Sequence, residues 1–393
     1  MRKIYMGLFV IITAITFLQC DQIIDSEIKP LDKERGNEFK LMLKDESGMM
    51  IKLLGTDKVN NALIRIKSNT LGTEYTAMSD SNGLVTFSGI ISDDYHISVQ
   101  REFTADEMQI ISGHSASGYR LINKKSAIIR LYANNKKSTE ISLDVVFAGS
   151  PFIISEMYAC GPQGSGLYYH DKYIELYNPT DSVQYLDGLL IIKSYSSETA
   201  GLNYRNDPEY IHSESIWYFP GSGKDHPVKP GQHIVCAEDG IDHRQNAPNS
   251  VDLSHADFEF YKTDAPDVDN QNVPNLLCFY QKAGNDWLPG GERDAFVIAK
   301  IPLNELKPYG TQYLIPYSAV LDGIEYMKDP TKLEKKTLND RIDAGSTGGI
   351  QFYTGKSMER IQLQAGGKSQ LLDNNNSSLD FKIIDKPTPG SHF

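Results

Sequence analysis

The fold is decided by Phe152–Leu189, FIISEMYACGPQGSGLYYHDKYIELYNPTDSVQYLDGL. Its pattern predicts a strand over Phe152–Tyr158, a Gly-rich loop, a second strand over Tyr173–Tyr177, and a third strand after the Asn-Pro-Thr-Asp turn. Within the second strand, Ile174 and Leu176 alternate with polar or aromatic residues. This period of two is typical of a half-buried strand, so the segment predicts a β-sheet with one solvated face.

The residue order of this segment resembles the opening of a lamin-tail-like β-sandwich domain. The pattern of that family runs Ile-x-Glu, a loop, Tyr-Ile-Glu-Leu-Tyr-Asn-Pro-Thr-Asp, and then Leu-x-Gly. Three later segments resemble further elements of the family in the same order: Val228–Asp239, Gly355–Arg360 and the C-terminal DNNNSSLDFKIIDKPTPGSHF. The resemblance implies a lamin-tail-like β-sandwich over residues 150–393, with loop insertions at 194–227 and 237–275.

An earlier region, residues 38–147, contains short alternating or apolar runs separated by turn residues, which predicts another all-β domain. It resembles the transthyretin-like or carboxypeptidase-regulatory-like family, whose domains serve as spacers. The matching residues are Val59, Ala62, Asp80, Gly83, Tyr95, Ile97 and Val99. We expect Gly83 to permit a tight turn, and the last three residues to share one face of a strand.

The N-terminus has the features of an export signal. Arg2 and Lys3 precede the apolar run Ile4–Leu18, which is short for a spanning helix and ends at Cys20. The cysteine resembles a bacterial lipoprotein cleavage site, which implies a signal peptide at 1–19, lipidation of Cys20, and a tether over 20–37. Ordinary signal cleavage nearby, or an uncleaved anchor, is the alternative. The acidic residues that follow the cysteine resemble the surface-export signals of Bacteroidetes lipoproteins. The whole architecture resembles an uncharacterised family of such lipoproteins at the outer membrane, facing the cell surface.

Bulk composition is that of a globular protein of about two domains, with 393 residues, 40% hydrophobic and 10% aromatic residues. The net charge of −12 contains no basic block, which argues against nucleic acid as a partner. Beyond Cys20 the thiols are Cys160, Cys236 and Cys278, so at most one disulfide forms, and which thiols would pair stays open. The predicted fold class is all-β, with two Ig-like or β-sandwich domains in tandem after a lipoprotein signal.

Aromatic residues supply the first candidate ligand site. Ten of the 22 tyrosines lie between residues 158 and 218. Tyrosine gives a binding loop rigid, amphipathic contact area at low entropic cost. The candidate ligand-binding residues are Tyr168, Tyr169, His170, Asp171, Trp217 and Tyr218. The alternative is that most of these aromatic side chains pack on the sandwich.

Oxygen-rich and histidine-rich loops supply candidate metal sites. The segment TDAPDVDNQN has the composition that calcium prefers, and its candidate ligands for a structural Ca²⁺ are Asp264, Asp267, Asp269 and Asn272. It lacks the Gly and terminal Glu of the helix–loop–helix calcium motif. Five of the nine histidines lie between residues 212 and 255. They are interleaved with acidic residues, which makes a transition-metal site conceivable, with solvated loop histidines as the alternative. These acidic residues are Asp225, Glu238, Asp239, Asp242, Asp252 and Asp257. No other cofactor is expected.

No catalytic motif stands out. Glu156 and Glu175 lie on strands expected to be neighbours and could serve acid–base catalysis, but the favoured interpretation is that they accept backbone hydrogen bonds. The Gly-rich loop after Phe152–Tyr158 leads into a strand and not into a helix, so it does not fit a dinucleotide loop.

These observations predict a non-catalytic surface lipoprotein, attached to the membrane through its lipid. It would act as a binding or accessory module for an outer-membrane TonB-dependent transporter in nutrient or metal uptake. The transporter association rests only on what surface lipoproteins of this kind commonly do. The alternative is a structural or adhesive protein that contacts a glycan or protein partner, and a hydrolase is a third, weaker hypothesis.

Overall fold

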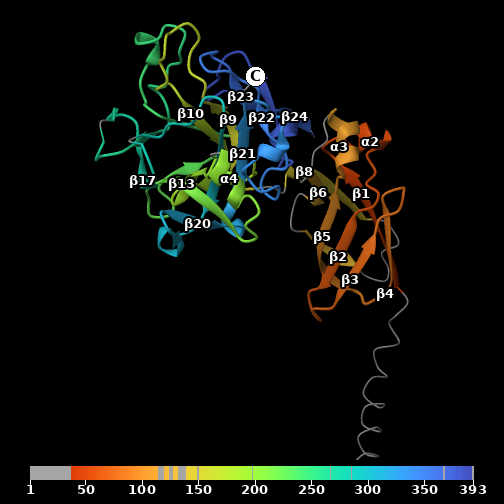
Figure 1. Ribbon diagram of the computed structural model, residues 1–393. Coiled ribbons are helices and arrows are strands. Elements are labelled where there is room, and N and C mark those ends of the chain that lie inside the picture. Colours follow the sequence, from red (N-terminus) through yellow and green to blue (C-terminus); the bar gives the residue numbers. More distant parts are fainter. Residues whose placement is uncertain are drawn as a thin grey trace, which may run out of the picture. The chain divides into compact units, whose positions relative to one another are not determined.

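The computed structural model describes residues 37–113, 119–123, 127–131, 139–147, 150–196, 198–265, 267–284, 286–365 and 368–391. The chain divides into two compact units (Figure 1). The first contains the described parts of Met1–Glu102 and Leu121–Asp144, and the second those of Phe103–Arg120 and Val145–Phe393. The expected signal peptide and tether, with Cys20, lie outside the described residues.

An eight-stranded sheet dominates the first unit, in the order β3-β2-β5-β6-β8-β1-β4, with β7 paired to β5. Its elements are β1 (Asn37–Asp45), α2 (Met49–Leu54), β2 (Leu63–Ser68), β3 (Glu74–Met78), β4 (Leu84–Ile90), β5 (Asp93–Glu102), β6 (Tyr119–Asn123), β7 (Ala127–Leu131) and β8 (Thr139–Phe147). Tyr95, Ile97 and Val99 are buried while His96 and Ser98 between them are exposed, which confirms the shared face. Gly83 has φ +72°, and a Cβ there would lie 2.8 Å from the carbonyl oxygen of Leu43, so this turn requires glycine.

The second unit is built almost entirely from strands. Its strands are β9 (Ile153–Tyr158), β10 (Tyr173–Tyr177), β11 (Gln184–Tyr185), β12 (Leu189–Ser194), β13 (Tyr210–Tyr218), β14 (Pro227–Val228), β15 (His233–Ala237), β16 (Phe258–Tyr261), β17 (Asn275–Gln281), β18 (Asp294–Lys300), β19 (Lys307–Tyr309), β20 (Gln312–Pro316), β21 (Val320–Met327), β22 (Thr347–Gly348), β23 (Ser357–Arg360), β24 (Gln362–Ala365), β25 (Lys368–Leu371) and β26 (Phe381–Ile384).

Helices in this unit are short. They are α3 (Ala105–Ser112), α4 (Glu198–Tyr204), α5 (Ser377–Asp380) and the 3₁₀ turns η2 (His243–Gln245), η3 (Leu303–Glu305), η4 (Tyr317–Ala319) and η5 (Leu333–Lys335). Within the described ranges, no helix is long and apolar enough to cross a membrane. Strands make up most of the secondary structure in the described residues, so the all-β fold class is confirmed.

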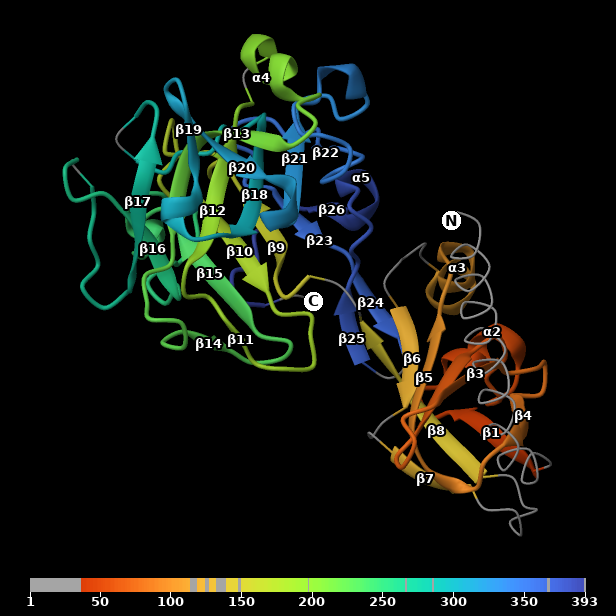
Figure 2. The ribbon, with the colours of Figure 1, turned by 90° about the horizontal axis from the view of Figure 1, so that it is seen from below.

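One long sheet of 14 strands organises the second unit, in the order β22-β21-β18-β12-β13-β17-β16-β15-β10-β9-β23-β26, with β20 paired to β13 and β19 to β20. The sheet curls so that β21, near one end, contacts β9, near the other (Figure 2). The main core lies within the curl and includes Trp217, Phe260, Phe296 and Met358. A second core, with Leu190, Ile192 and Val297, lies on the other face of β12 and β18, so these central strands are buried on both sides.

The prediction of a half-buried second strand is wrong, because all five residues of β10 are buried. Its polar face is covered by the C-terminal segment. The backbone N–H of Gly390 donates to Glu175 Oε2 at 2.6 Å, and that of Thr388 donates to Glu156 Oε1 at 3.2 Å. The two glutamates are thus acceptors for backbone donors, which confirms their expected scaffold role.

The two expected loop insertions are only partly loops. Residues 194–227 contain α4 and the nine-residue strand β13, which pairs with β12, β17 and β20. Residues 237–275 contain η2 and β16. Both strands form because they bury large apolar side chains, among them Trp217 and Phe260, whose rings meet edge to face at 5.3 Å.

Closure of the curled sheet depends on a buried ion pair. Arg360 at the end of β23 donates through Nη2 to Asp322 Oδ2 of β21 at 2.5 Å, and both side chains are 1% exposed. Nε of the same arginine donates to the carbonyl oxygen of Ile154 in β9, whose N–H donates to Asp322. Nη1 donates to the carbonyl oxygen of Leu372. One guanidinium therefore connects both ends of the sheet to the C-terminal region.

All three cysteines in the described residues are free thiols. Cys236 is fully buried in β15, as its apolar context predicts, and Cys160 is also buried. Cys278 in β17 is only partly buried and packs against the main core.

Replacing Arg360 by methionine should lower the free energy of unfolding by about 3–5 kcal/mol, because it leaves the Asp322 carboxylate buried without its counter-ion. Urea denaturation of the purified protein measures the change. The matched control is Lys356→Met, which breaks the exposed pair with Asp385 and should cost at most about 1 kcal/mol. Equal losses in the two variants would contradict the role assigned to the buried pair.

A second carboxylate, Asp187, holds the loop before β14. It lies in the Leu-Asp-Gly sequence that follows β11, and three backbone N–H groups donate to it, from Gly223, Asp225 and His226, at 2.9–3.0 Å. Burial alone would raise the pKa of this carboxyl, but the three donors outweigh burial and lower it to about 2.

Because the pKa of Asp187 is lower in the folded protein than in an unfolded chain, its stabilisation is complete above about pH 4 and is lost as the pH falls toward 2. At pH 7, Asp187→Asn should cost about 1–3 kcal/mol, measured by urea unfolding. The difference from the unchanged protein should shrink between pH 4 and pH 2. Asp181→Asn, in an exposed turn, is the matched control and should change the free energy of unfolding at pH 7 by less than about 0.5 kcal/mol.

Candidate functional site

Parallel strands bring several acidic loops to one edge of the sheet. β15, β16 and β17 are parallel neighbours, so their carboxyl ends lie at the same edge. Glu238 and Asp239 directly follow β15, Asp267 lies in the connection after β16, and Asp286 follows β17. The β9–β10 loop arrives at this edge as well, because Tyr173 at the start of β10 pairs with Ala237 at the end of β15.

Glycine shapes the β9–β10 loop. Gly161 has φ +81°, and a Cβ there would lie 2.8 Å from the carbonyl oxygen of Tyr168, so the loop folds back on itself only with glycine at this position. Tyr168 is fixed in turn by His243, since its Oη lies 2.6 Å from Nδ1. Nε2 of His243 must donate to the carbonyl oxygen of Asp239, 3.0 Å away, so Nδ1 accepts the hydrogen bond from the tyrosine. Burial lowers the pKa of His243 to about 4, so the ring is neutral at pH 7.

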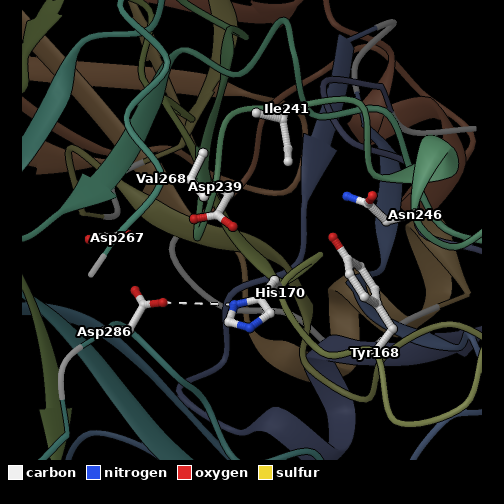
Figure 3. A pocket seen from close by; sticks show the side chains of 8 residues that line it. All are labelled: Tyr168, His170, Asp239, Ile241, Asn246, Asp267, Val268 and Asp286. Atoms are coloured by element: carbon white, nitrogen blue, oxygen red, sulfur yellow. Dashed lines mark ion pairs between the residues drawn. The ribbon is translucent and has the colours of Figure 1, made fainter. Parts of the chain in front are cut away.

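These loops surround a cavity of about 530 Å³ (Figure 3). We call it the carboxylate pocket, and its lining residues are Tyr168, His170, Asp239, Ile241, Asn246, Asp267, Val268 and Asp286. In Figure 3, the side chains of His170, Asp239 and Asp286 point toward one another, and the Tyr168 hydroxyl and the Asn246 amide form the other side. The pocket thus combines a dense set of metal-ligating groups with a few apolar and neutral polar contacts.

Two triads of possible ligands meet in the pocket. The first consists of His170, Glu238 and Asp286, and the second of Asp239, Asp267 and Asp286. Within each triad, the ligand atoms lie within 4.8 Å of one another. His170 Nδ1 is 2.8 Å from Glu238 Oε1 and 3.8 Å from Asp286 Oδ2. Imidazole nitrogen and carboxylate oxygen are both common metal ligands.

Electrostatics in the pocket strongly disfavour the charged forms of these carboxyls. Burial, followed by the charge of Asp286, holds the pKa of Glu238 well above its ordinary value. The same two causes raise the pKa of Asp239 to about 8 and that of Asp267 to about 6. Burial also raises the pKa of Asp286. Without a cation, the pocket therefore retains protons that ordinary carboxylates release.

Two carboxylate oxygens of residues that line the pocket are buried and have no hydrogen-bond partner within the described residues: Asp239 Oδ1 and Asp267 Oδ1. Asp239 is 4% exposed, and Glu238 is fully buried with a side-chain hydrogen bond to Asp286. Buried polar atoms are nearly always paired, so the two unpaired oxygens make the pocket a candidate binding site.

A brace between the loops keeps the pocket in shape. Glu259 in β16 accepts from the backbone N–H groups of Gly240 and Asn270, both at 2.7 Å. The side-chain amide of Asn270 donates to the carbonyl oxygen of Gly240. Together they fasten the loop of Asp239 to the loop of Asp267.

The tyrosine-rich candidate site is divided by the structure. Tyr168 and His170 line the carboxylate pocket, and Tyr169 is 40% exposed and stacks on His170 with ring centres 4.5 Å apart. Asp171 is fully buried and accepts from Tyr158 and Ser250.

The expected contribution of Trp217 and Tyr218 needs correction, because they lie in β13 and not in a loop. Trp217 is fully buried in the main core, where no external ligand reaches it. Tyr218 lines a different cavity of about 540 Å³, between Asp187 and Lys300.

Of the four expected calcium ligands, only Asp267 reaches the pocket. Asp264 is exposed and pairs with Lys262 Nζ at 2.7 Å. Asp269 accepts from Gln271 and Asn275, and Asn272 Nδ2 lies 3.4 Å from Asn270 Oδ1. The four residues therefore do not form one coordination sphere.

The five clustered histidines are also separated. His212 lies beside Asp207, His233 beside Glu175, and His243 beside Tyr168. In the part of the chain that the structure describes, His170 is the histidine that belongs to a metal-ligating group.

Sequence reasoning missed Asp286, and it considered Glu238 and Asp239 only as acidic residues among the clustered histidines. An acidic pair that immediately follows the apolar strand HIVCA was an available signal, since strand ends often carry function. Nothing in the local sequence marks Asp286.

Similarity to known proteins supports the fold and reveals no activity. The sequence model of a family described as "Protein of unknown function (DUF4876)" matches residues 229–313 and 304–388, a region that includes the four triad carboxylates but not His170. The crystal structure of a DUF4876 family protein from Bacteroides thetaiotaomicron VPI-5482 has 22% sequence identity and a TM-score of 0.57, over 88% of this chain and 94% of that chain. The likeness shows a shared fold.

Other similarities are weak. The shaft pilin SpaA from Lactobacillus rhamnosus GG has 9% identity and a TM-score of 0.17, over 73% of this chain and 95% of that chain. BcpA, the major pilin subunit of Bacillus cereus, has 9% identity and a TM-score of 0.19, over 74% of this chain and 94% of that chain. Neither supports an argument about this protein. No curated protein matches the chain.

Tyr168→Phe should lower the free energy of unfolding by about 1–2 kcal/mol, because the buried Nδ1 of His243 loses its donor. Urea denaturation measures this change. Tyr169→Phe is the matched control and should stay within about 0.5 kcal/mol, since Tyr169 is exposed at the loop surface. If both variants behave alike, the Tyr168–His243 bond does not hold the loop.

Proposed function

We propose that this protein is an exported, lipid-anchored surface protein without catalysis of its own, and that its second unit binds divalent cations in the carboxylate pocket. The lipoprotein-like sequence that ends at Cys20 supports the anchor. The pocket supports the binding role, since one imidazole and three carboxylates line it, and a fourth carboxylate, Glu238, lies 2.8 Å from that imidazole.

The observation that carries this proposal is the pair of buried, unpartnered carboxylate oxygens on Asp239 and Asp267, which both line the pocket. Removing ionised carboxylates from water costs several kcal/mol each unless an opposite charge compensates. The nearby Lys172 is insufficient, because its Nζ donates to the carbonyl oxygen of Pro289 at 2.6 Å and provides only one positive charge. A divalent cation in contact with the carboxylates provides the compensation.

Lipid anchoring and cation binding together suit an accessory role in uptake. Surface lipoproteins of the kind that this sequence resembles commonly work beside outer-membrane TonB-dependent transporters. A pocket for divalent cations favours metal or metal-complex delivery within that proposal.

A structural or adhesive role is the second candidate function. The observation that favours it is the exposure of Leu167 and Tyr169, 77% and 40%, on the loop that also carries His170. Exposed apolar and aromatic side chains of this kind suit contact with a glycan or protein partner.

Metal titration tests the cation proposal directly. The full-length protein, stripped with a chelator, should bind Ca²⁺ and Mn²⁺ in calorimetric titrations. Its melting temperature should rise on the order of 5–10 °C when the metal is at about 100 times its Kd, since binding to the folded state then contributes about 2.7 kcal/mol.

The double variant Asp239→Asn, Asp267→Asn should weaken Ca²⁺ binding by about 100-fold or more, given that loss of an outer-shell partner alone costs roughly 10–100-fold. Asp264→Asn is the matched control from the same acidic loop and should bind as the unchanged protein does. Absence of binding heat and of any thermal shift with both metals would overturn the proposal.

A further inference from the structure

The carboxylate pocket contains two triads and not one, which raises the question of how many ions it holds. We infer that the pocket is a dinuclear site, in which Asp286 bridges a nitrogen-and-oxygen subsite formed by His170 and Glu238 and an all-oxygen subsite formed by Asp239 and Asp267. This inference rests on the proposed cation binding and specifies its stoichiometry and selectivity.

Spacing within the first triad fits a metal ion. For bonds of about 2.1 Å, neighbouring ligand atoms lie about 3.0 Å apart in an octahedron and about 3.4 Å apart in a tetrahedron. His170 Nδ1 lies 2.8 Å from Glu238 Oε1 and 3.8 Å from Asp286 Oδ2, on either side of these values. An ion that binds there takes His170 and Glu238 as ligands in place of the direct contact between them.

Unpartnered buried oxygens lie in the second triad, where they are Oδ1 of Asp239 and Oδ1 of Asp267. In the first triad, Glu238 faces His170 through Oε1 and forms a side-chain hydrogen bond with Asp286. Each triad therefore has its own set of contacts, and Asp286 is the residue that the two triads share.

Charge also favours more than one ion. The four triad carboxylates carry four negative charges when ionised, and Lys172 provides one positive charge nearby, so a single divalent cation leaves a net negative charge that a second compensates. Asp286 belongs to both triads, and a carboxylate offers one oxygen to each of two ions. Ions bridged in this way lie about 3.5–4 Å apart in two-metal sites.

The two subsites should differ in the metals they accept. Ca²⁺ takes oxygen ligands, so the His170 subsite disfavours it while the Asp239–Asp267 subsite suits it. Mn²⁺ accepts imidazole nitrogen as well as carboxylate oxygen and is expected in both subsites. The pocket should therefore bind one Ca²⁺ but two Mn²⁺.

Stoichiometry measured on the stripped full-length protein tests this assignment. We expect calorimetry and elemental analysis after gel filtration to find one equivalent of Ca²⁺ and two of Mn²⁺. The two-Mn²⁺ protein should give the electron paramagnetic resonance spectrum of an exchange-coupled pair, in place of the hyperfine pattern of an isolated ion.

His170→Phe removes the nitrogen ligand but keeps a ring that can stack on Tyr169. It should lose one of the two Mn²⁺ equivalents and leave Ca²⁺ binding unchanged. His255→Phe, an exposed histidine outside both triads, is the control and should retain two. A melting temperature near that of the unchanged apo-protein verifies that each variant is folded.

The outcomes separate the two proposals. One Mn²⁺ without exchange coupling, or two Mn²⁺ that persist in His170→Phe, overturns the dinuclear assignment and leaves cation binding in place. No bound metal of either kind overturns cation binding itself. Two Ca²⁺ would contradict the difference assigned to the two subsites.

Discussion

The buried contact of Arg360 with Asp322 is the constraint on which the second unit depends. A sheet of 14 strands has two edges, and a curled sheet stays closed only if something holds its ends together. Here the strands at the two ends of the sheet are not paired with each other. The guanidinium of Arg360 connects these ends by donating to β21, to β9 and to the C-terminal region. Because all of these acceptors are desolvated, the arginine is difficult to replace by any other single residue.

Closure also determines where the acidic loops meet. The parallel set β15, β16 and β17 lies opposite the ion pair in the strand order, and its carboxyl ends share one edge with the β9–β10 loop. A closed sheet fixes the distances between these strand ends, so loops that are distant in sequence reach the same cavity. The Glu259 brace then holds two of the loops at a fixed spacing. The carboxylate pocket is therefore positioned by strand topology, while its chemistry comes from loop residues.

Local patterns in the sequence predict the strands but do not predict which residues form the candidate site. The strands around the opening segment, the shared face of Tyr95, Ile97 and Val99, and the scaffold role of Glu156 and Glu175 follow from alternation and from turn residues. The burial of β10 on both faces does not follow from local patterns, because the residues that cover this strand are more than 200 positions away in the sequence. Composition drew attention to the loop of His170 and to Asp267, and both residues line the carboxylate pocket. It could not assemble the triads, because Asp286 joins them only through long-range strand order.

The pocket is better explained as a binding site than as a structural necessity of the fold. A core that needed only stability would replace buried carboxylates by apolar groups, since isolated buried charge is costly and apolar packing is not. The chain instead places Asp239 at nearly full burial beside a cavity, with an oxygen that nothing in the described residues satisfies. A buried polar group that folding leaves unsatisfied is typical of functional sites, where a ligand completes the missing interaction. Arg360 satisfies a buried carboxylate from within the chain, whereas the proposed cation site requires a partner from outside to do the same.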